Sequence, residues 1–442
     1  MGCDGTRFAG WDIGEGPVKD NSGDTGVLDT LDAAADRFTA GDSSRLGAAK
    51  YAFDSEIGPQ PDAWWKRNAS DLPPGLIAGI LHGGRYGAIF RFIAFDRLQG
   101  EVPVEGGEKK IDLGAEMHSG SSHGFIWILV KEKSRMLFFD PSANFKMVAA
   151  IDLPNNERPV TATFVRGEAK TFIGLEKKPY LRVIHHDVDS IQSERFTKVS
   201  ITCSNSANYP APADMLVDEG NILVALSCLP AEPSSKKPGD PAELVVVDMV
   251  SEKLVGRVVL PSLRAHPGLD KSEDDSLGVG VSRVFVPKRF PSDRKPAKDG
   301  AIYELNRLSN GNGYEIGDEL VAESDLNSYI LDFILRGKQN GIIGTSDRPT
   351  YGGNREIYAF EVSASGEKPG LTSLLPGEPI KNYMCALHRN AIIGLGVTGL
   401  RNPEQGFSLY SLKGHEPLYP LGFSLPAYRF PHLTEQDCTI VE

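Results

Sequence analysis

Residues 209–261 read YPAPADMLVDEGNILVALSCLPAEPSSKKPGDPAELVVVDMVSEKLVGRVVLP. Four short apolar runs, separated by Gly, Pro or charge-rich turns, lie in this stretch: Asp214–Val217, Ile222–Ser227, Leu244–Asp248 and Leu254–Leu260. Runs of this length that are rich in Val, Ile and Leu predict β-strands rather than helices. The stretch therefore predicts one four-stranded antiparallel sheet. Because both faces of such a sheet are apolar, it needs neighbouring sheets stacked against it, and a repeated unit is expected.

Copies of the unit occur along the chain. Residues 332–347 (DFILRGKQNGIIGTSD) and 382–397 (NYMCALHRNAIIGLGV) align without a gap at an offset of 50. Weaker copies bring the number of units to seven, at roughly 76–115, 116–157, 158–205, 206–262, 276–325, 326–378 and 379–430. Such a repeat predicts an all-β fold, a β-propeller, for which seven four-stranded blades fit best. Six or eight blades stay open, because the first unit and residues 262–300 are less regular.

The repeat divides the chain into three parts. Residues 76–430 form the predicted propeller, residues 1–75 an irregular acidic tether or arm, and residues 431–442 a C-terminal tail. Between Asp4 and Glu56 there are 11 acidic and 5 basic residues, a composition that suits a partly disordered segment. Leu28–Phe38 has helical spacing, so one short helix is expected within this arm.

Charge and hydropathy exclude two classes of partner. The formal net charge of −12 argues against a nucleic-acid partner, because phosphate binding draws on clustered Lys and Arg. No apolar run reaches the roughly 18 residues of a membrane-spanning helix. The sequence therefore predicts contact with a membrane only through a lipid anchor.

The first residues carry the localisation signal. Met1-Gly2-Cys3-Asp4-Gly5-Thr6 fits the myristoylation pattern at Gly2, with Cys3 as a site for a second acyl chain. Alternatively, Cys3 is the lipidated first residue of a mature bacterial lipoprotein whose signal peptide is missing here. A chain without any lipid is the third alternative. The lipoprotein hypothesis predicts an extracytoplasmic, membrane-tethered protein.

The other four cysteines form no C-x-x-C pair, so a zinc site is not expected. Two disulfides are the simplest arrangement in an oxidising compartment: Cys203 with Cys228, and Cys385 with Cys438. Four reduced, buried thiols in strands are the alternative.

Three motifs resemble catalytic or metal sites without their context. Gly120-Ser-Ser122-His-Gly124 fits G-x-S-x-G, but a strand rather than a helix is expected after it, so a turn is predicted. Gly394-Leu-Gly396-Val-Thr-Gly399 fits G-x-G-x-x-G, but no helix can open at the Pro that follows. His185-His186 has no third ligand at a recognisable spacing, so we expect solvated loop histidines and no metal site.

The inner strands of a propeller offer the best candidate site. Asp214, Asp332 and Asn382 lie at corresponding positions of three units, and such positions meet around the central channel. We predict that they bind a polar ligand at the channel mouth, or alternatively that they hydrogen-bond neighbouring blades. No cofactor is predicted, although a structural cation in the channel would suit these residue types.

The quoted stretch resembles the YVTN-type repeats of bacterial surface and periplasmic propellers. PADMLVDEGNILVAL followed by ELVVVDMVSEKLVGRVVLP carries the likeness, which weakens before residue 160. The resemblance implies a propeller fold in an extracytoplasmic setting. It implies no activity, since one fold hosts many functions, and no catalytic residue can be carried over.

Two functional hypotheses follow from the repeat, the charge and the resemblance. The first is a non-enzymatic binding or scaffold propeller, anchored at a cell envelope, that uses a loop face to hold a protein or polysaccharide partner. The second is an extracytoplasmic lyase, hydrolase or metal-dependent lactonase with its site at the channel mouth. Clustering of titratable side chains at that mouth would favour the enzyme.

Overall fold

A computed structural model describes most of the chain from residue 76 onward. The described residues are 76–84, 87–95, 109–114, 117–122, 124–140, 143, 146–165, 167–187, 189–230, 241–263, 266–282, 298–309, 313–347, 354–363, 368–374, 380–388, 391–396, 406–411, 423–424 and 435–441. The predicted arm, with Cys3 and the expected short helix, lies outside them. Among the described helices, none is long and apolar enough to cross a membrane.

The stretch quoted above folds into one antiparallel sheet, as its four apolar runs predict. Its strands, in spatial order, are β13 (Pro212–Asp218), β14 (Asn221–Leu226), β16 (Pro241–Asp248) and β17 (Lys253–Leu263). Glu219 and Gly220 form the turn between β13 and β14, both with positive φ, as in the two-residue turns that match strand twist. Every residue of β14 is buried, because other sheets cover both of its faces.

Three more sheets have the same sequential order. They consist of β4 (Met117–Ser122), β5 (Phe125–Val130), β6 (Arg135–Asp140) and β7 (Lys146–Asp152); β8 (Pro159–Val165), β9 (Lys170–Leu175), β10 (Tyr180–Asp187) and β11 (Ser190–Ser200); and β18 (His266–Lys271), β19 (Leu277–Ser282), β20 (Ala301–Arg307) and β21 (Tyr314–Ala322). The third of these begins at His266, ten residues before the expected start at 276. Its first strand, HPGLDK, contains Pro and Gly and no apolar run, so the sequence pattern missed it.

The next eight strands form one continuous sheet. It contains β22 (Tyr329–Gly337), β23 (Asn340–Ser346), β24 (Asn354–Glu361), β25 (Gly370–Ser373), β26 (Ile380–His388), β27 (Ala391–Gly396), β28 (Gly406–Ser411) and β29 (Phe423–Ser424). Two residue pairs between β24 and β26 join its halves. Because the two halves share one sheet, the number of seven blades stays a prediction.

The C-terminal segment contributes a strand rather than a tail. β30 (Glu435–Val441) pairs with β1 (Leu76–Gly84), which continues into β2 (Gly87–Phe95) and β3 (Lys109–Gly114). The first sheet therefore combines the C-terminal strand with three N-terminal strands. This pairing closes the ring, so that the innermost strand of this sheet contacts the inner strands β4 and β26 on its two sides.

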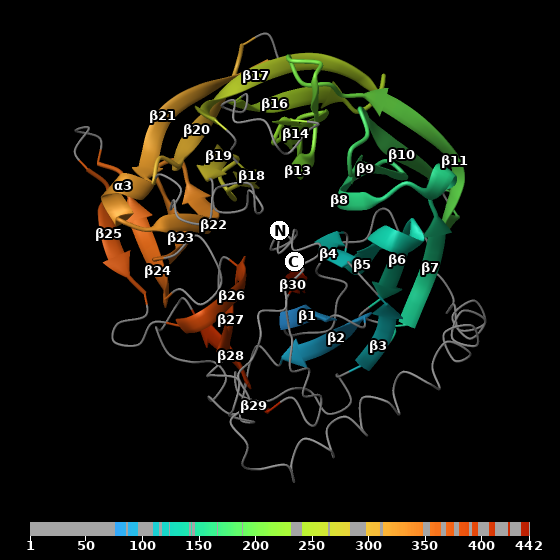
Figure 1. Ribbon diagram of the computed structural model, residues 1–442, viewed down its shortest axis with the longest axis horizontal. Helices are drawn as coiled ribbons and strands as arrows, with labels where there is room; N and C mark the ends of the chain where they lie inside the picture. The colour runs from blue at the N-terminus through green and yellow to red at the C-terminus, as the bar shows by residue number, and fades with distance from the viewer. Residues whose placement is uncertain are drawn as a thin grey trace, which may run out of the picture.

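The sheets stand radially around a central axis, with β30 near the centre (Figure 1). Successive innermost strands contact one another around the whole ring, in the order β30, β4, β8, β13, β18, β22, β26 and back to β30. Apolar clusters fill the spaces between neighbouring sheets. The described chain is thus an all-β propeller, as the repeat predicts.

A disulfide links the segment that follows β11 to the segment that follows β14. Cys203 and Cys228 are bonded, with their Cα atoms 5.8 Å apart, and both are buried. Cys203 follows β11, and Cys228 follows β14 two residues after its end. The second expected pair stays a prediction, because the side chains of Cys385 and Cys438 are outside the described part, although their strands β26 and β30 contact each other.

We expect the doubly substituted Cys203→Ala, Cys228→Ala protein to lose about 3 kcal/mol of unfolding free energy, because a loop of this size no longer restricts the unfolded chain. Urea denaturation of the two proteins, without reductant, measures the difference. A wild-type protein whose urea midpoint is insensitive to reductant would contradict this prediction.

Candidate functional site: the inner strands and the contacts between blades

Three carboxylates lie on consecutive innermost strands. Asp214 is on β13, Asp270 on β18 and Asp332 on β22. Asp214 and Asp332 each follow an irregularity in strand pairing, and each accepts a hydrogen bond from the backbone N–H of the next residue, at 2.8 and 2.9 Å. A bulge re-aims the following side chain, so the two carboxylates have matching local geometry.

Two of these carboxylates bridge neighbouring blades. The backbone N–H of Leu269 on β18 donates to Asp214 Oδ2 at 2.8 Å. The backbone N–H of Leu335 on β22 donates to Asp270 Oδ2. Each carboxylate therefore ties its own inner strand to the next one around the ring. For Asp214 this is the bracing alternative that the sequence left open.

The third carboxylate has the most unusual electrostatic environment. Burial raises the pKa of Asp332 to about 7, and the nearby carboxylates of Asp270 and Asp214 add to this rise. The hydrogen bond from the backbone N–H of Phe333 opposes it. The carboxyl of Asp332 can therefore hold or release a proton near neutral pH.

Because its pKa is raised on folding, Asp332 favours the folded state below the unfolded value of 3.8, and this contribution is lost as the pH rises through about 7. We expect Asp332→Asn to melt about 2–4 °C above the wild type at pH 8, since the amide needs no charge in this environment. The difference should shrink as the pH is lowered toward 4. Calorimetry across this range measures it, with Asp187→Asn at the exposed end of β10 as the control; a lower melting temperature for Asp332→Asn at pH 8 would refute the prediction.

The third predicted ligand is placed differently. The offset of 50 puts Asn382 over Asp332, which lies opposite Gly344. In the structure Met384 lies opposite Gly394, the equivalent of Gly344, and Asn382 pairs with Gly396. The bulges of β22 and β26 fall at different positions, so a gapless alignment does not give the register. The side chain of Asn382 is outside the described part.

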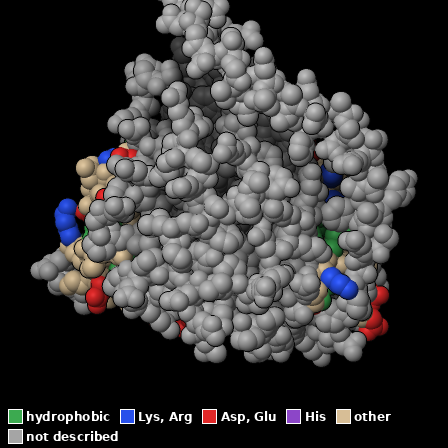
Figure 2. All heavy atoms as spheres, turned by 90° about the horizontal axis from the view of Figure 1, so that it is seen from below, with side chains coloured by type: hydrophobic (Ala, Val, Ile, Leu, Met, Phe, Trp, Pro, Cys, Tyr) green, Lys and Arg blue, Asp and Glu red, His purple; other side chains and the backbone are tan. Residues whose placement is uncertain are grey.

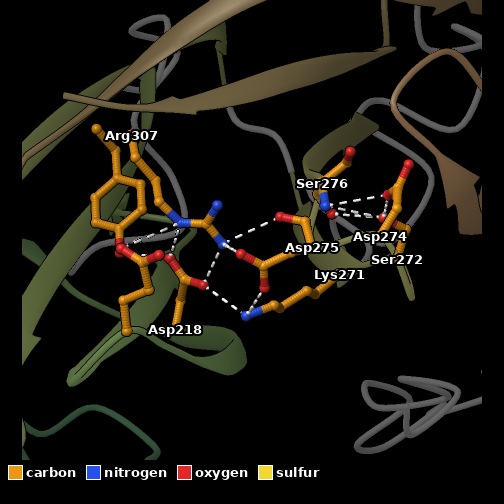
Figure 3. Close-up of polar contacts among 9 residues, drawn as sticks. Asp218, Lys271, Ser272, Asp274, Asp275, Ser276 and Arg307 are labelled. Atoms are coloured by element: carbon orange, nitrogen blue, oxygen red, sulfur yellow. Dashed lines mark hydrogen bonds and ion pairs between the residues drawn. The ribbon is translucent and has the colours of Figure 1, made fainter. Parts of the chain in front are cut away.

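A network of charges joins the sheet of β13 to the sheet of β18 (Figure 3). It lies beside the turn between β13 and β14 and the turn between β18 and β19. Asp218 ends β13 and its side chain is fully buried. It accepts hydrogen bonds from three residues of the next sheet: Lys271 Nζ at 2.8 Å, Arg307 Nε at 2.8 Å and Nη2 at 2.6 Å, and Tyr314 OH at 2.7 Å. Asp275 is half-exposed and contacts the same two cations.

Burial raises the pKa of Asp218, but the hydrogen bonds from Arg307, Lys271 and Tyr314 outweigh it and lower this pKa to about 2. The adjacent turn is held within itself: Ser272 Oγ donates to Asp274, and the backbone N–H of Ser276 donates to Ser272 Oγ at 2.9 Å. The network is thus a brace between two blades whose central anion is charged at neutral pH.

The two adjacent histidines are buried strand residues, which corrects the expectation of solvated loop positions. Both lie in β10, where the alternation of a strand places them on opposite faces. His186 Nδ1 donates to the carbonyl of Ile191 at 2.6 Å, and its Nε2 lies 2.7 Å from Thr171 Oγ1. Burial lowers the pKa of His186 to about 4, so this ring is neutral at physiological pH.

His185 faces the neighbouring sheet. Its Nε2 lies 3.0 Å from Glu252 Oε1 and 3.0 Å from Thr197 Oγ1. Thr197 in turn donates to Glu252 Oε2 at 2.5 Å. Glu252, from the turn between β16 and β17, therefore connects that turn to β10 and β11. Among the side chains that the structure describes, no three His, Cys, Asp or Glu residues converge as a metal site.

The G-x-S-x-G motif spans a hairpin. Ser122 ends β4 and pairs with Phe125, which starts β5, so a strand follows the turn and a nucleophile elbow is not formed. Gly120 is required for packing, since a Cβ atom there would lie 2.0 Å from the Trp127 ring. The motif is structural, as its sequence context predicts.

Sequence reasoning missed Asp218 and Asp270. Asp218 precedes a Glu-Gly turn and looked like an ordinary turn residue, and its cationic partners are 53 and 89 residues away. Asp270 lies in the region that the repeat left irregular. Its one available signal was an Asp two residues after a Pro-Gly pair, which is too weak to identify an inner strand.

No protein-family model matches the sequence, and no curated protein matches it. Among solved structures, the chain is similar to dihydro-heme d1 dehydrogenase NirN, at 10% identity over 81% of this chain and 80% of that chain, with a TM-score of 0.46. It is similar to the β-propeller domain of Myceliophteria thermophila Cps50 (Swd1), at 10% identity over 72% and 90%, with a TM-score of 0.46. It is also similar to the Dos1 propeller, at 10% identity over 76% and 78%, with a TM-score of 0.44. At this identity the likeness is one of fold and assigns no activity.

Proposed function

We propose that this chain is a non-enzymatic binding or scaffold propeller, tethered at a cell envelope, that holds a protein or polysaccharide partner. The proposal places it outside the cytoplasm, among propellers of the YVTN-repeat type, with a lipid anchor at Cys3 as its link to a membrane. It includes no cofactor.

The observation that carries this proposal is the use of buried and half-buried carboxyl groups. Asp218, Asp214 and Asp270 each bond a residue of the neighbouring blade, and Glu157 and Glu323 fasten connections between blades in the same way. Carboxyl groups that make such bonds hold neighbouring blades in fixed positions. A stiff frame that presents loops and edges suits recognition, because little ordering is needed on binding.

The disulfide and the first residues support the localisation. Cys203–Cys228 fits an oxidising compartment. Cys3 is followed at once by polar and acidic residues, a composition suited to a tether between an anchor and a folded body.

We expect Cys3→Ser to release the protein from membranes into the soluble fraction with an unchanged melting temperature. Each buried methylene of an acyl chain contributes roughly 0.8 kcal/mol, so losing two or more chains abolishes stable anchoring. Fractionation of cells that express the gene with its native upstream sequence gives the measurement. Continued sedimentation of Cys3→Ser with membranes would show that the anchor lies elsewhere.

Binding itself is tested by presenting the purified protein with isolated envelope polysaccharide and with envelope protein, each immobilised, at low and physiological salt. Saturable binding to one of them without turnover supports the proposal. Release of product from an extracellular sugar or lactone substrate would replace it by the enzyme hypothesis.

The enzyme hypothesis has one specific observation in its favour, the carboxyl of Asp332 with a pKa of about 7 on an inner strand. A group that titrates near neutral pH is suited to general acid–base chemistry in a lyase, hydrolase or metal-dependent lactonase. Under this alternative, Asp332→Asn abolishes turnover, and metal analysis of the purified protein detects a bound cation in the lactonase case.

A further inference from the structure

The large apolar side chains that are exposed in the described part of the chain gather in one hairpin. They are Val250, Leu254, Val255 and Val259, which are 72%, 40%, 42% and 55% exposed. Val250 lies in the turn between β16 and β17, and the other three lie on β17. On the described surface visible in Figure 2, acidic and basic side chains lie beside smaller apolar areas at both flanks of the molecule.

β17 is the outermost strand of its sheet, at the rim of the propeller (Figure 1). It is 11 residues long, and within the described chain it pairs only with β16. Its other edge therefore presents backbone N–H and C=O groups outward. Such an edge can accept an added strand.

The two neighbouring outer strands carry more exposed charge than β17, on which Lys253 at its start is the exposed charged residue among those described. β21 exposes Glu315, Asp318 and Glu319. β11 contains Arg195 and Lys198. Charged side chains on an edge strand oppose pairing with another chain, and exposed apolar side chains favour it. The contrast singles out β17 among these three edges.

Two of the four exposed side chains, Leu254 and Val259, form a row that faces one side of the sheet. Leu254 lies opposite Val247, and Val259 lies opposite Glu243. Val247 packs in the cluster shared with the β8–β11 sheet, and Glu243 accepts the backbone N–H of Ser204 beyond β11. Opposite residues of an antiparallel pair share a face, so Leu254 and Val259 lie on the side of β17 toward β11.

Arg257 lies between Leu254 and Val259 on the same face, but its charge is already used. It donates to Glu243 and to the carbonyl of Thr202. The row therefore presents apolar surface next to a fixed and neutralised guanidinium.

The face of β17 away from β11 has acidic surroundings, whereas β11, on the near side, carries the exposed Arg195 and Lys198. The acidic strand β21 contacts β17 from the other side. A second copy of this chain, with its net charge of −12, would bring like charges together here, whereas a basic segment would be attracted.

We infer that the outer edge of β17 is a docking surface for an extended segment of a partner protein in which apolar and basic residues alternate. The segment adds to the sheet as a strand, its apolar side chains cover Leu254 and Val259, and its basic side chains, on the opposite face, lie toward the acidic strand β21. This inference rests on the proposed binding function and specifies the chemistry of the partner.

The test uses the full-length protein and a fluorescent synthetic peptide of about ten residues in which Val and Lys alternate, a length that can pair along the strand. We expect saturable binding that weakens with salt. Val259→Lys and, separately, Leu254→Lys should each weaken it at least about tenfold, because each removes apolar surface and adds a repelling charge. Ser200→Lys, at an exposed position of the β11 edge, should bind as the wild type does. A peptide methylated on alternate backbone nitrogens should not bind.

Both test positions are exposed, so the variants should fold, and matching melting temperatures check this. Absence of saturable binding up to about 1 mM peptide, or equal binding by both Lys variants and the wild type, would overturn the inference. A concentration-dependent dimer that Val259→Lys abolishes would assign the edge to a second copy and overturn it as well. If the peptide does not bind but immobilised envelope material does, the docking surface is wrong and the proposed function stands. If the peptide binds but envelope material does not, the proposed envelope function is wrong and the docking surface stands.

Discussion

Replacing Asp218 by Asn is expected to lower the free energy of unfolding by about 3–5 kcal/mol, because breaking a buried ion pair leaves charges without their partner. Arg307 and Lys271 would lose their shared anion, and the hydroxyl of Tyr314 would lose its acceptor. These groups come from the sheet next to that of Asp218, so the substitution loosens the contact between two blades. Urea denaturation at pH 7 measures the effect.

Asp275→Asn is the matched control. Asp275 contacts the same two cations but is half-exposed, and an exposed ion pair contributes up to about 1 kcal/mol. The folded pKa of Asp218 is lowered to about 2, so its contribution is present above the unfolded value of 3.8 and is lost as the pH falls toward 2. Equal losses for Asp218→Asn and Asp275→Asn would show that burial of the anion is not what makes the network stabilising.

Glu157→Ala is the second substitution with a large expected effect, a loss of about 3–5 kcal/mol of unfolding free energy. Glu157 is fully buried in the connection between β7 and β8. It accepts hydrogen bonds from Arg182, which is itself buried, at 2.8 Å through Nε and also through Nη2, and from the hydroxyl of Tyr180 at 2.8 Å. The substitution therefore leaves a buried guanidinium without its counter-charge.

The double substitution Glu157→Leu, Arg182→Leu should recover most of the lost stability, because removing both charges also removes their desolvation cost. Asp152→Ala provides the control, since the Arg135–Asp152 pair is exposed on the Asp152 side and should contribute up to about 1 kcal/mol. Urea denaturation of the wild type and of these three variants at pH 7 measures the differences in unfolding free energy. A double variant as unstable as Glu157→Ala would contradict the account.

The strands and their repetition follow from local sequence. β14 and β23 are short apolar runs between turn residues, and such a run forms a strand in almost any context that covers both faces. The gapless repeat correctly predicts two hairpins, β22–β23 and β26–β27. It does not predict their register, because a bulge shifts every later residue and leaves no clear mark in the sequence.

Two innermost strands were missed for a common reason. β18 reads HPGLDK and β30 reads EQDCTIV, and neither has the apolar run that marks the other strands. Each is a strand because a neighbouring strand supplies its hydrogen-bond partners, β19 in one case and β1 in the other. The β30–β1 pair joins the first and the last of the described strands, a contact that no local pattern can contain.

For the candidate site, too, the sequence predicts the positions of residues within strands but not their partners in space. That Asp214 and Asp332 lie on inner strands could be predicted, because position within a repeated unit is a local property. Which groups they and Asp218 would meet could not, because Leu269 lies 55 residues from Asp214, and Arg307 and Tyr314 lie 89 and 96 residues from Asp218. A strand depends on the composition of a few neighbouring residues, whereas the pKa and bonds of a carboxylate depend on groups within a few ångströms in space. The packing of neighbouring sheets against each other brings those groups together.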